Sequence, residues 1–87
     1  MTTLAVRHTV SDFDTWKSVF DGHASVRTGH GSTGQRVLHD GNTVLALIDF
    51  PDAASVQSFM DDPSLAEAMH KGGVIGAPEI SVLVEAA

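Results

Sequence analysis

The stretch from Thr43 to Phe50 is apolar at nearly every position through its middle, reading Thr-Val-Leu-Ala-Leu-Ile-Asp-Phe. A strand with one face in water alternates apolar and polar residues, so this run predicts a strand that is covered on both faces. The rest of the chain supplies only enough helix to cover one face of a small sheet. A second copy of the chain is the simplest cover for the other face. The alternative is a solvated face that tolerates a few leucines.

Three further strands are predicted from runs of alternating apolar and polar residues bounded by turn signals. They cover residues 4–10, 33–39 and 79–85. The segment Asp40-Gly41-Asn42 predicts a tight turn that joins the second strand to the apolar run. A loop is expected at residues 74–78, before the last strand.

Two helical regions lie between these strands. The first is expected to run from about Asp12 to His23 or a few residues further, and a loop is expected to follow at residues 28–32. Ser11 is its expected N-cap, and Asp14 completes a variant of the capping box. Its inward stripe recurs at helical spacing and consists of Phe13, Trp16, Phe20, His23 and Arg27.

The second helical region is predicted in two pieces, residues 53–60 and 64–71. Asp62 is the expected cap of the second piece, Pro63 takes its first helical position, and Gly72-Gly73 ends it. Both pieces place apolar residues on one side, so the region is expected to pack against the sheet.

The predicted order β-α-β-β-α-β is the ferredoxin-like arrangement of the α+β class, and residues 1–87 form one domain. It gives a four-stranded antiparallel sheet with both helical regions on one face. The helix-facing side is expected to carry Leu4, Val6, Val10, Val44, Ala46, Ile48, Phe50, Ile80, Val82 and Val84. The opposite side carries Leu45, Leu47 and Leu83 among polar and charged residues. An apolar centre with a polar rim is typical of a self-complementary dimer interface.

Composition narrows the function further. The 87 residues include eleven acidic and five basic side chains, a formal net charge of −6, and no cysteine. This balance argues against nucleic acid and anionic membranes as partners, and disulfides and thiol nucleophiles are impossible. No apolar run approaches the ~20 residues of a membrane-spanning helix, and the first residues lack a signal-peptide pattern. The lack of cysteine fits a cytoplasmic protein, and the small size favours support by dimerisation.

Histidines are the most unusual ingredient, and two of them are candidate catalytic residues. His8 lies on the helix-facing side of a central strand, and His23 continues the inward stripe of the first helix. A partly buried imidazole is the usual group for moving a proton near neutral pH, so the pair is a candidate acid and base. The alternative is two core histidines, each satisfied by a backbone or hydroxyl partner.

Bulky apolar residues are expected beneath the sheet beside these histidines. They are Trp16, Phe20, Phe59, Met60 and Met69. They form either an ordinary core or the wall of a pocket for a flat, apolar substrate, since aromatic and methionine side chains suit such ligands.

The other histidines suggest less. His30 stands between two glycines and is either an exposed loop residue or a mobile group at a pocket mouth. His39 is expected in solvent. His70 suits the negative end of a helix dipole. No paired His-x-x-x-His spacing occurs, so no metal site is predicted.

The chain resembles a known superfamily in its element order, in the segment Asp-Phe-Asp-Thr-Trp-Lys-Ser-Val-Phe at 12–20, and in Gly-Val-Ile-Gly-Ala-Pro-Glu-Ile at 73–80. These features are similar to the dimeric α+β barrel superfamily, which includes antibiotic biosynthesis monooxygenases, muconolactone isomerases and small actinobacterial proteins labelled cyclases. The resemblance covers essentially the whole chain and is closest to the last group. It implies a homodimer whose sheets pack face to face, with a ligand cavity between each sheet and its helices.

The resemblance also implies an activity. Many relatives act on polycyclic aromatic or polyketide-like compounds of secondary metabolism without a metal or organic cofactor. Monooxygenase-like members often carry a tryptophan, a tyrosine and an asparagine around the substrate; this chain has Trp16, no tyrosine, and a single asparagine, Asn42, in a turn.

Two hypotheses follow. The first is a cofactor-independent cyclase, isomerase or monooxygenase that uses His8 and His23. The second is a non-catalytic module that binds a metabolite or haem, with His70 as the candidate axial ligand.

Overall fold

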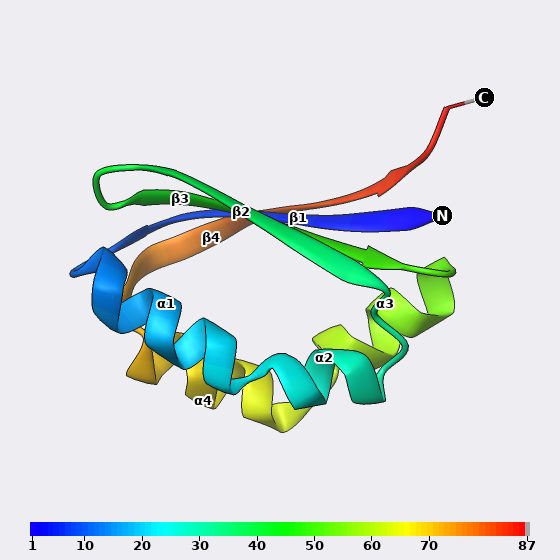
Figure 1. Ribbon diagram of the computed structural model, residues 1–87, viewed down its shortest axis with the longest axis horizontal. Coiled ribbons are helices and arrows are strands. Elements are labelled where there is room, and N and C mark those ends of the chain that lie inside the picture. Colours follow the sequence, from blue (N-terminus) through cyan, green and yellow to red (C-terminus); the bar gives the residue numbers. More distant parts are fainter. Residues whose placement is uncertain (87) are drawn as a thin grey trace.

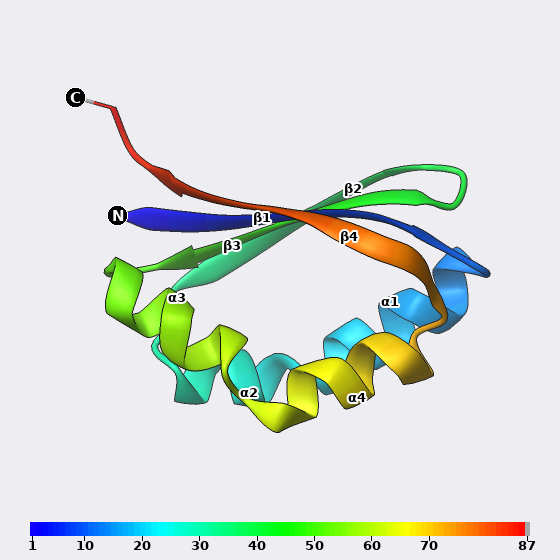
Figure 2. The same ribbon diagram turned by 180° about the vertical axis from the view of Figure 1, so that it is seen from behind.

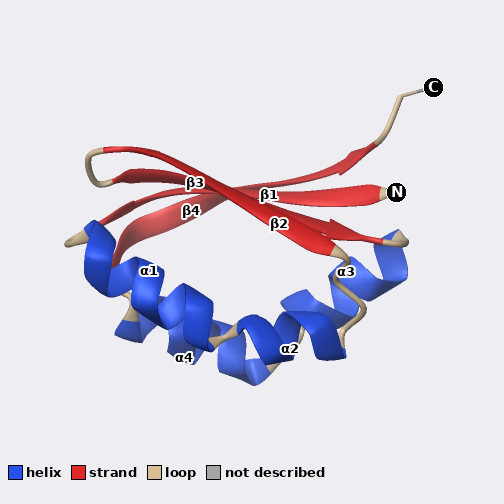
Figure 3. Cartoon of the chain, in the orientation of Figure 1, coloured by secondary structure: helices blue, strands red, loops and turns tan. Residues whose placement is uncertain are grey.

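A computed structural model describes residues 1–86 and shows two layers, a sheet and a set of helices that covers one of its faces (Figures 1 and 3). The elements follow the order β1 (Thr2–Val10), α1 (Phe13–Gly22), α2 (Ala24–Gly29), β2 (Gly34–Asp40), β3 (Thr43–Phe50), α3 (Ala53–Met60), α4 (Pro63–Lys71) and β4 (Val74–Val84). Figure 2, seen from behind, shows that all the helices lie on the same side of the sheet. The predicted ferredoxin-like α+β fold is confirmed.

The sheet has the strand order β2-β3-β1-β4, and every neighbouring pair is antiparallel. β1 and β3 are therefore central, as their composition predicts. Their helix-facing residues are almost completely buried and form the core with Val56 and Phe59 of α3 and Trp16 of α1. This core comprises Leu4, Val6, Val10, Val44, Ala46, Ile48 and Phe50 from the strands.

The first helical region begins and divides differently from the prediction. Asp12, not Ser11, is the N-cap of α1: its side chain accepts hydrogen bonds from the backbone N–H of Thr15 at 2.9 Å and from the Thr15 hydroxyl at 2.8 Å. Ser11 instead donates its backbone N–H to Gly73 O at 2.9 Å, which joins the end of β1 to the start of β4. Serine and aspartate are both good caps, so this backbone pairing decides between them.

The predicted helix is also divided at His23, whose φ and ψ of −92° and 3° are not helical. α2 then continues to Gly29, so Thr28 and Gly29, predicted as loop, are helical. The second helical region agrees with the prediction, because α3 and α4 have the expected bounds within one residue, and Asp62 caps α4 with Pro63 at its first position.

β4 differs most from the prediction. Residues 74–78, predicted as a loop, are part of this strand, which pairs with β1 on both sides of an irregularity. Arg7 pairs with Glu79 and Thr9 with Ile75, so three residues of β4 stand opposite His8 alone. Gly76 lies in this bulge with a φ of +72°, a left-handed backbone conformation that residues other than glycine rarely adopt.

The apolar residues of β4 are exposed, contrary to the expectation that they meet the helices. Ile80, Val82 and Val84 share the face of Val6, Leu4 and Thr2, respectively, but are 41%, 50% and 74% exposed. β4 is an edge strand, and the helices do not cover this part of the face. The opposite face of the sheet, with Leu45, Leu47 and Leu83, has no cover within residues 1–86 (Figure 1).

Candidate active site

A small cavity lies between the sheet and the helices, with a volume of about 50 Å³. Side chains from the central strands form its floor, and side chains from all four helices form its roof. The lining consists of Val6, His8, Trp16, Val19, Phe20, His23, Arg27, Ala46, Ile48, Phe59, Leu65, Ala68 and Met69. Apart from two histidines and one arginine, this lining is apolar.

His8 faces the cavity from β1. It is only 7% exposed, and neither Nδ1 nor Nε2 has a hydrogen-bond partner among residues 1–86. Its ring lies edge-on to Trp16, with the ring centroids 5.3 Å apart. Burial lowers the pKa of His8 below its ordinary value of 6.5, because the charged imidazolium loses its hydration. His8 is therefore a neutral, buried imidazole at pH 7.

His23 lines the same cavity from the junction of α1 and α2. The break in the helix at this residue allows its Nε2 to lie 2.9 Å from Ser64 Oγ on α4. Burial and the nearby Arg27 lower the pKa of His23, and Asp62 opposes this effect. His23 is thus a second neutral imidazole, held in place by one hydroxyl.

His23 also borders a larger surface groove between α1 and α4, two helices that lie side by side in Figures 1 and 2. The groove has a volume of about 250 Å³ and shares Val19, His23 and Ala68 with the cavity. Its remaining lining consists of Gly22, Ser64, Glu67 and Lys71. The hydrogen bond between His23 and Ser64 therefore lies between the groove and the cavity.

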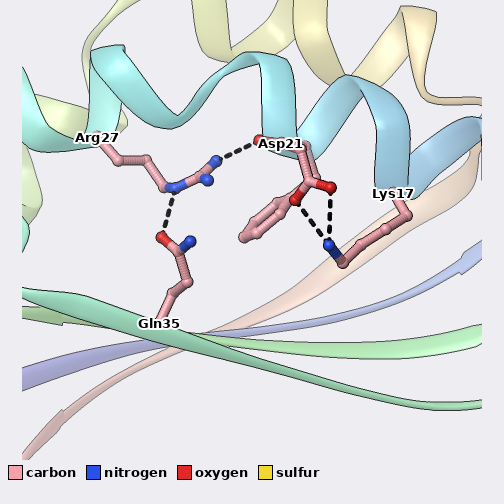
Figure 4. Close-up of polar contacts among 5 residues, drawn as sticks. Lys17, Asp21, Arg27 and Gln35 are labelled. Carbon is pink, nitrogen blue, oxygen red and sulfur yellow. Dashed lines mark hydrogen bonds and ion pairs between the residues drawn. The ribbon is translucent and has the colours of Figure 1, made fainter.

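Arg27 of α2 is the third polar group of the cavity, and it is only 1% exposed. Figure 4 shows its polar contacts. Its Nη1 donates to Phe20 O at 2.8 Å, and its Nε donates to Gln35 Oε1 at 3.1 Å. The guanidinium lies over the Phe20 ring, 3.8 Å from its centroid. Nη2 has no partner among residues 1–86. Burial lowers the pKa of Arg27, and Asp21 partly offsets this, but an arginine keeps its charge.

The sequence reasoning placed Arg27 on the inward stripe of the first helix but gave it no role. One signal marks it as unusual: no aspartate or glutamate stands three or four residues before or after it, so it has no helical ion-pair partner. A cation at a stripe position without such a partner is a candidate buried charge.

A second polar cluster, here called the latch, consists of His30, Ser58 and Asp62. His30 Nδ1 lies 2.7 Å from Ser58 Oγ, and His30 Nε2 lies 2.8 Å from Asp62 Oδ2. Asp62 also accepts the backbone N–H of Ser64 at 2.9 Å. Hydrogen bonds from His30 and Ser64 lower the pKa of Asp62 to about 2. The latch joins the end of α2 to α3 and to the start of α4, and His30 does not line the cavity.

Of the residues predicted to form the site, His8, His23, Trp16, Phe20, Phe59 and Met69 line the cavity. Met60 does not; it packs against the hydrophobic core. His70 is exposed in the last turn of α4 and lies outside the cavity, so it does not face a ligand there. His39 is exposed and stacks on Phe13 with the ring centroids 3.6 Å apart.

Two properties of residues 1–86 bear on other functions. No three histidine, cysteine, aspartate or glutamate side chains in that range are grouped so that they could hold a metal ion. None of the helices described is both long and apolar enough to cross a membrane.

No model of a known protein family matches the sequence, and no curated protein matches it. Solved structures do match the fold. SnoaB from Streptomyces nogalater, described as a cofactor-independent oxygenase, superposes with a TM-score of 0.83 at 15% identity, covering 99% of this chain and 93% of SnoaB.

Two further solved structures agree. A protein from Bordetella bronchiseptica described as an antibiotic biosynthesis monooxygenase gives a TM-score of 0.83 at 7% identity, with 99% and 97% of the two chains covered. The monooxygenase ActVA-Orf6 of Streptomyces coelicolor, solved with the ligand nanaomycin D, gives 0.70 at 15% identity, with 99% and 88% covered.

The chain therefore has the fold of the antibiotic biosynthesis monooxygenase-like proteins, as the resemblance to the dimeric α+β barrel superfamily implies. At these identities the likeness establishes the fold, and the chemistry has to be argued from this chain's own residues.

Proposed function

We propose that this chain is a cofactor-independent enzyme that moves a proton on a small apolar, aromatic or polyketide-like metabolite of secondary metabolism. His8 and His23 act as base and acid, and Trp16, Phe20, Phe59 and Met69 hold the flat substrate between the sheet and the helices. Met60 has only an indirect part, because it supports the core behind this wall.

One observation carries the proposal: both ring nitrogens of His8 are buried beside an apolar cavity and have no partner among residues 1–86. Buried polar atoms in proteins are nearly always hydrogen-bonded, and leaving one unpaired costs about 1–3 kcal/mol. A ligand that donates an O–H or acidic C–H to the unprotonated nitrogen of His8, and accepts a hydrogen bond from its N–H, would remove this cost. A neutral imidazole at pH 7 is also the form that accepts a proton.

Isomerisation or cyclisation needs no group beyond the chain and its substrate. His8 takes a proton from an acidic C–H or O–H bond, and the electron pair of that bond becomes an enolate or phenolate. Return of the proton to a different atom by an imidazolium completes an isomerisation. Attack of the enolate carbon on a carbonyl within the substrate, followed by protonation of the new alkoxide, completes a cyclisation. A monooxygenase reaction would additionally consume dioxygen as second substrate: one oxygen atom would oxidise a substrate CH2 group to a carbonyl, and the other would leave as water with the two hydrogens.

The cavity must enlarge to accept a ring. Its volume of about 50 Å³ is well below the roughly 150 Å³ of a cavity that binds benzene. The groove between α1 and α4 supplies the adjoining space of about 250 Å³. We expect the substrate to enter there by displacing the hydrogen bond between His23 and Ser64.

Deuterium exchange tests the proposed proton transfer. 2-Tetralone, a flat ketone with an acidic C–H next to its carbonyl, is incubated with the protein in heavy water, and loss of its proton signal is followed by NMR. We expect the protein to accelerate exchange above the buffer rate, and His8→Gln or His23→Gln to lose most of this acceleration. His70→Gln is the matched control, because His70 is exposed on α4 outside the cavity.

Two results would count against the proposal. If the His8 and His23 variants both exchange at the wild-type rate while remaining folded, their roles are misassigned. If ligands of this kind bind with no exchange above buffer, the chain is a binding module rather than an enzyme.

We further propose that the chain works as a homodimer through the face of the sheet that faces away from the helices. Leu45 and Leu47 of β3 lie at the middle of this face, and Leu38 and Leu83 on the two edge strands are 42% and 52% exposed. Arg7 of β1 and Glu79 of β4 stand opposite each other in the strand register, on the same side of the sheet. An apolar middle with charges around it is a self-complementary surface.

Sedimentation tests the homodimer. We expect a species of twice 9.1 kDa at micromolar concentration, and Leu47→Glu should shift it toward the monomer because a buried carboxylate is costly. Asp14→Lys on the exposed side of α1 is the control. A wild-type monomer at that concentration would overturn the homodimer proposal while leaving the cavity chemistry to be tested by exchange.

A further inference from the structure

Arg27 is the charged member of the cavity lining. The other polar lining residues, His8 and His23, have lowered pKa values and are neutral at pH 7. The positive charge inside the cavity therefore comes from a side chain that is 99% buried and whose Nη2 has no partner among residues 1–86.

No carboxylate neutralises this charge within the part of the chain that the structure describes. Asp21 is the acid that influences Arg27, but its two oxygens accept the Lys17 ammonium at 2.7 and 2.8 Å, as Figure 4 shows. The groups that Arg27 does contact, Phe20 O and Gln35 Oε1, are neutral acceptors. A buried cation with only neutral partners is an unfavourable arrangement unless an anion completes it.

The surroundings of Arg27 also restrict how such an anion would bind. One face of the guanidinium is stacked on the Phe20 ring, and Nε and Nη1 each already have an acceptor. Among residues 1–86, the unpaired donors of Arg27 are thus concentrated at Nη2, on a guanidinium that lies over the Phe20 ring. This arrangement suits an oxyanion attached to a flat apolar body, with the oxyanion at Nη2 and the ring against Phe20 and Phe59.

We propose that the cavity is built for an organic anion, an aryl carboxylate or a compound of the same shape and charge, with Arg27 as its anion-binding residue. The proposal rests on the cavity being the ligand site of the proposed function, but it does not depend on catalysis. It also specifies the preferred ligand class: an acidic metabolite ahead of a neutral one of the same shape. Because the whole chain carries a net charge of −6, this anion selectivity would be a local effect of one buried side chain.

A matched pair of probes tests the charge. Benzoate and benzamide have nearly the same shape, and only benzoate is anionic at pH 7. The chain has a single tryptophan, Trp16, which lines the cavity, so its fluorescence reports binding directly. We expect wild-type protein to bind benzoate about 10- to 100-fold more tightly than benzamide, the usual range for a charge-assisted hydrogen bond.

Variants then assign the selectivity to Arg27. Arg27→Met removes the charge at similar length and should bring the two dissociation constants close together, whereas Arg27→Lys should keep part of the preference. Arg36→Gln is the control, because Arg36 is an exposed arginine on β2 outside the cavity. We expect it to retain the wild-type preference.

The proposal is overturned if wild-type protein binds benzamide as tightly as benzoate, if neither binds at millimolar concentration, or if Arg27→Met keeps the preference. Should Arg27→Met not fold, the thermal midpoint of the wild type still decides, since benzoate must raise it more than benzamide does. Deuterium exchange on 2-tetralone is independent of this result. Benzoate selectivity without exchange would leave the anion site intact and refute the catalytic role. Exchange without benzoate selectivity would support the catalytic role and refute the anion site.

Discussion

Two polar clusters in this small molecule differ in how completely their hydrogen bonds are made. In the latch, both nitrogens of His30 have partners, at 2.7 Å on Ser58 and 2.8 Å on Asp62. In the cavity, three buried nitrogens on His8 and Arg27 have none among residues 1–86. The latch is closer to solvent and the cavity cluster is almost fully buried. The unpaired atoms therefore lie where a missing hydrogen bond costs the most free energy.

This difference separates a structural role from a ligand-binding one. A satisfied cluster that joins the ends of α2, α3 and α4 holds the helices together. An unsatisfied buried cluster does not stabilise the fold, and a ligand is the natural source of the missing partners. Substitutions in the latch should therefore change stability, and substitutions in the cavity should change activity or binding.

The largest expected effect is on the proton transfer proposed for His8. His8→Gln should reduce the protein-catalysed exchange of 2-tetralone by about 100-fold or more, the range for loss of a general base. His30→Gln in the latch should change the exchange rate little while lowering the thermal midpoint. Equal rate losses in the two variants would mean that the clusters do not differ in function.

The next effect is on stability, at Asp62. Asp62→Ala removes the N-cap of α4 and the acceptor of His30 together, so it should lower the thermal midpoint by a few degrees. Asp62→Asn keeps an oxygen acceptor for the Ser64 N–H and should cost less. Calorimetry of the two variants measures the difference, and an unchanged midpoint in Asp62→Ala would show that the latch does not support the helices.

The pH dependence of stability should separate the two clusters again. His8 and His23 have lowered pKa values when folded, so the unfolded chain binds protons first, and the free energy of unfolding should fall as pH drops below 6.5. The Asp62 contribution is present above its ordinary pKa of 3.8 and is lost as pH falls toward about 2. Urea titrations at several pH values should therefore show two acid steps.

Variants assign these steps. His8→Gln should weaken the fall in the free energy of unfolding that begins near pH 6.5. Asp62→Asn should weaken the fall at lower pH. If His8→Gln leaves the upper step unchanged, burial does not penalise its charged form as described.

The smallest expected effect is at Ser64, whose hydroxyl meets His23 between the groove and the cavity. Ser64→Ala should cost about 1 kcal/mol or less of stability and leave the cap of α4 in place, because Asp62 binds the backbone N–H of Ser64. Benzoate should associate faster in this variant, which stopped-flow fluorescence of Trp16 can measure. Slower association would argue against entrance through the groove.

The sequence was sufficient for the features that depend on periodicity. Alternation and turn residues predict the strand order and the central place of residues 43–50, and the helical stripe predicts that His8 and His23 approach one space. It was insufficient where tertiary pairing decides. The bulge opposite His8 depends on how β4 pairs with β1, and the choice of Asp12 over Ser11 as cap depends on a backbone bond to Gly73.

Arg27 was missed for a different reason. Arginines on helices usually extend their charge into solvent, and here the short α2, the stacking on Phe20 and the bond to Gln35 keep the guanidinium inside. None of these contacts can be recognised from spacing alone. The absence of a neighbouring acid was visible, but it acquires meaning only when burial is known.

The pH profile of exchange shows whether His8 is a buried neutral base in the cavity. The rate of 2-tetralone exchange should be level near pH 7 and fall only at a pH below the ordinary imidazole value of 6.5, where the folded protein passes through the lowered pKa of His8. In His8→Gln the residual exchange should lack this fall. A wild-type profile with no acid limb, or the same limb in His8→Gln, would show that His8 is not the base.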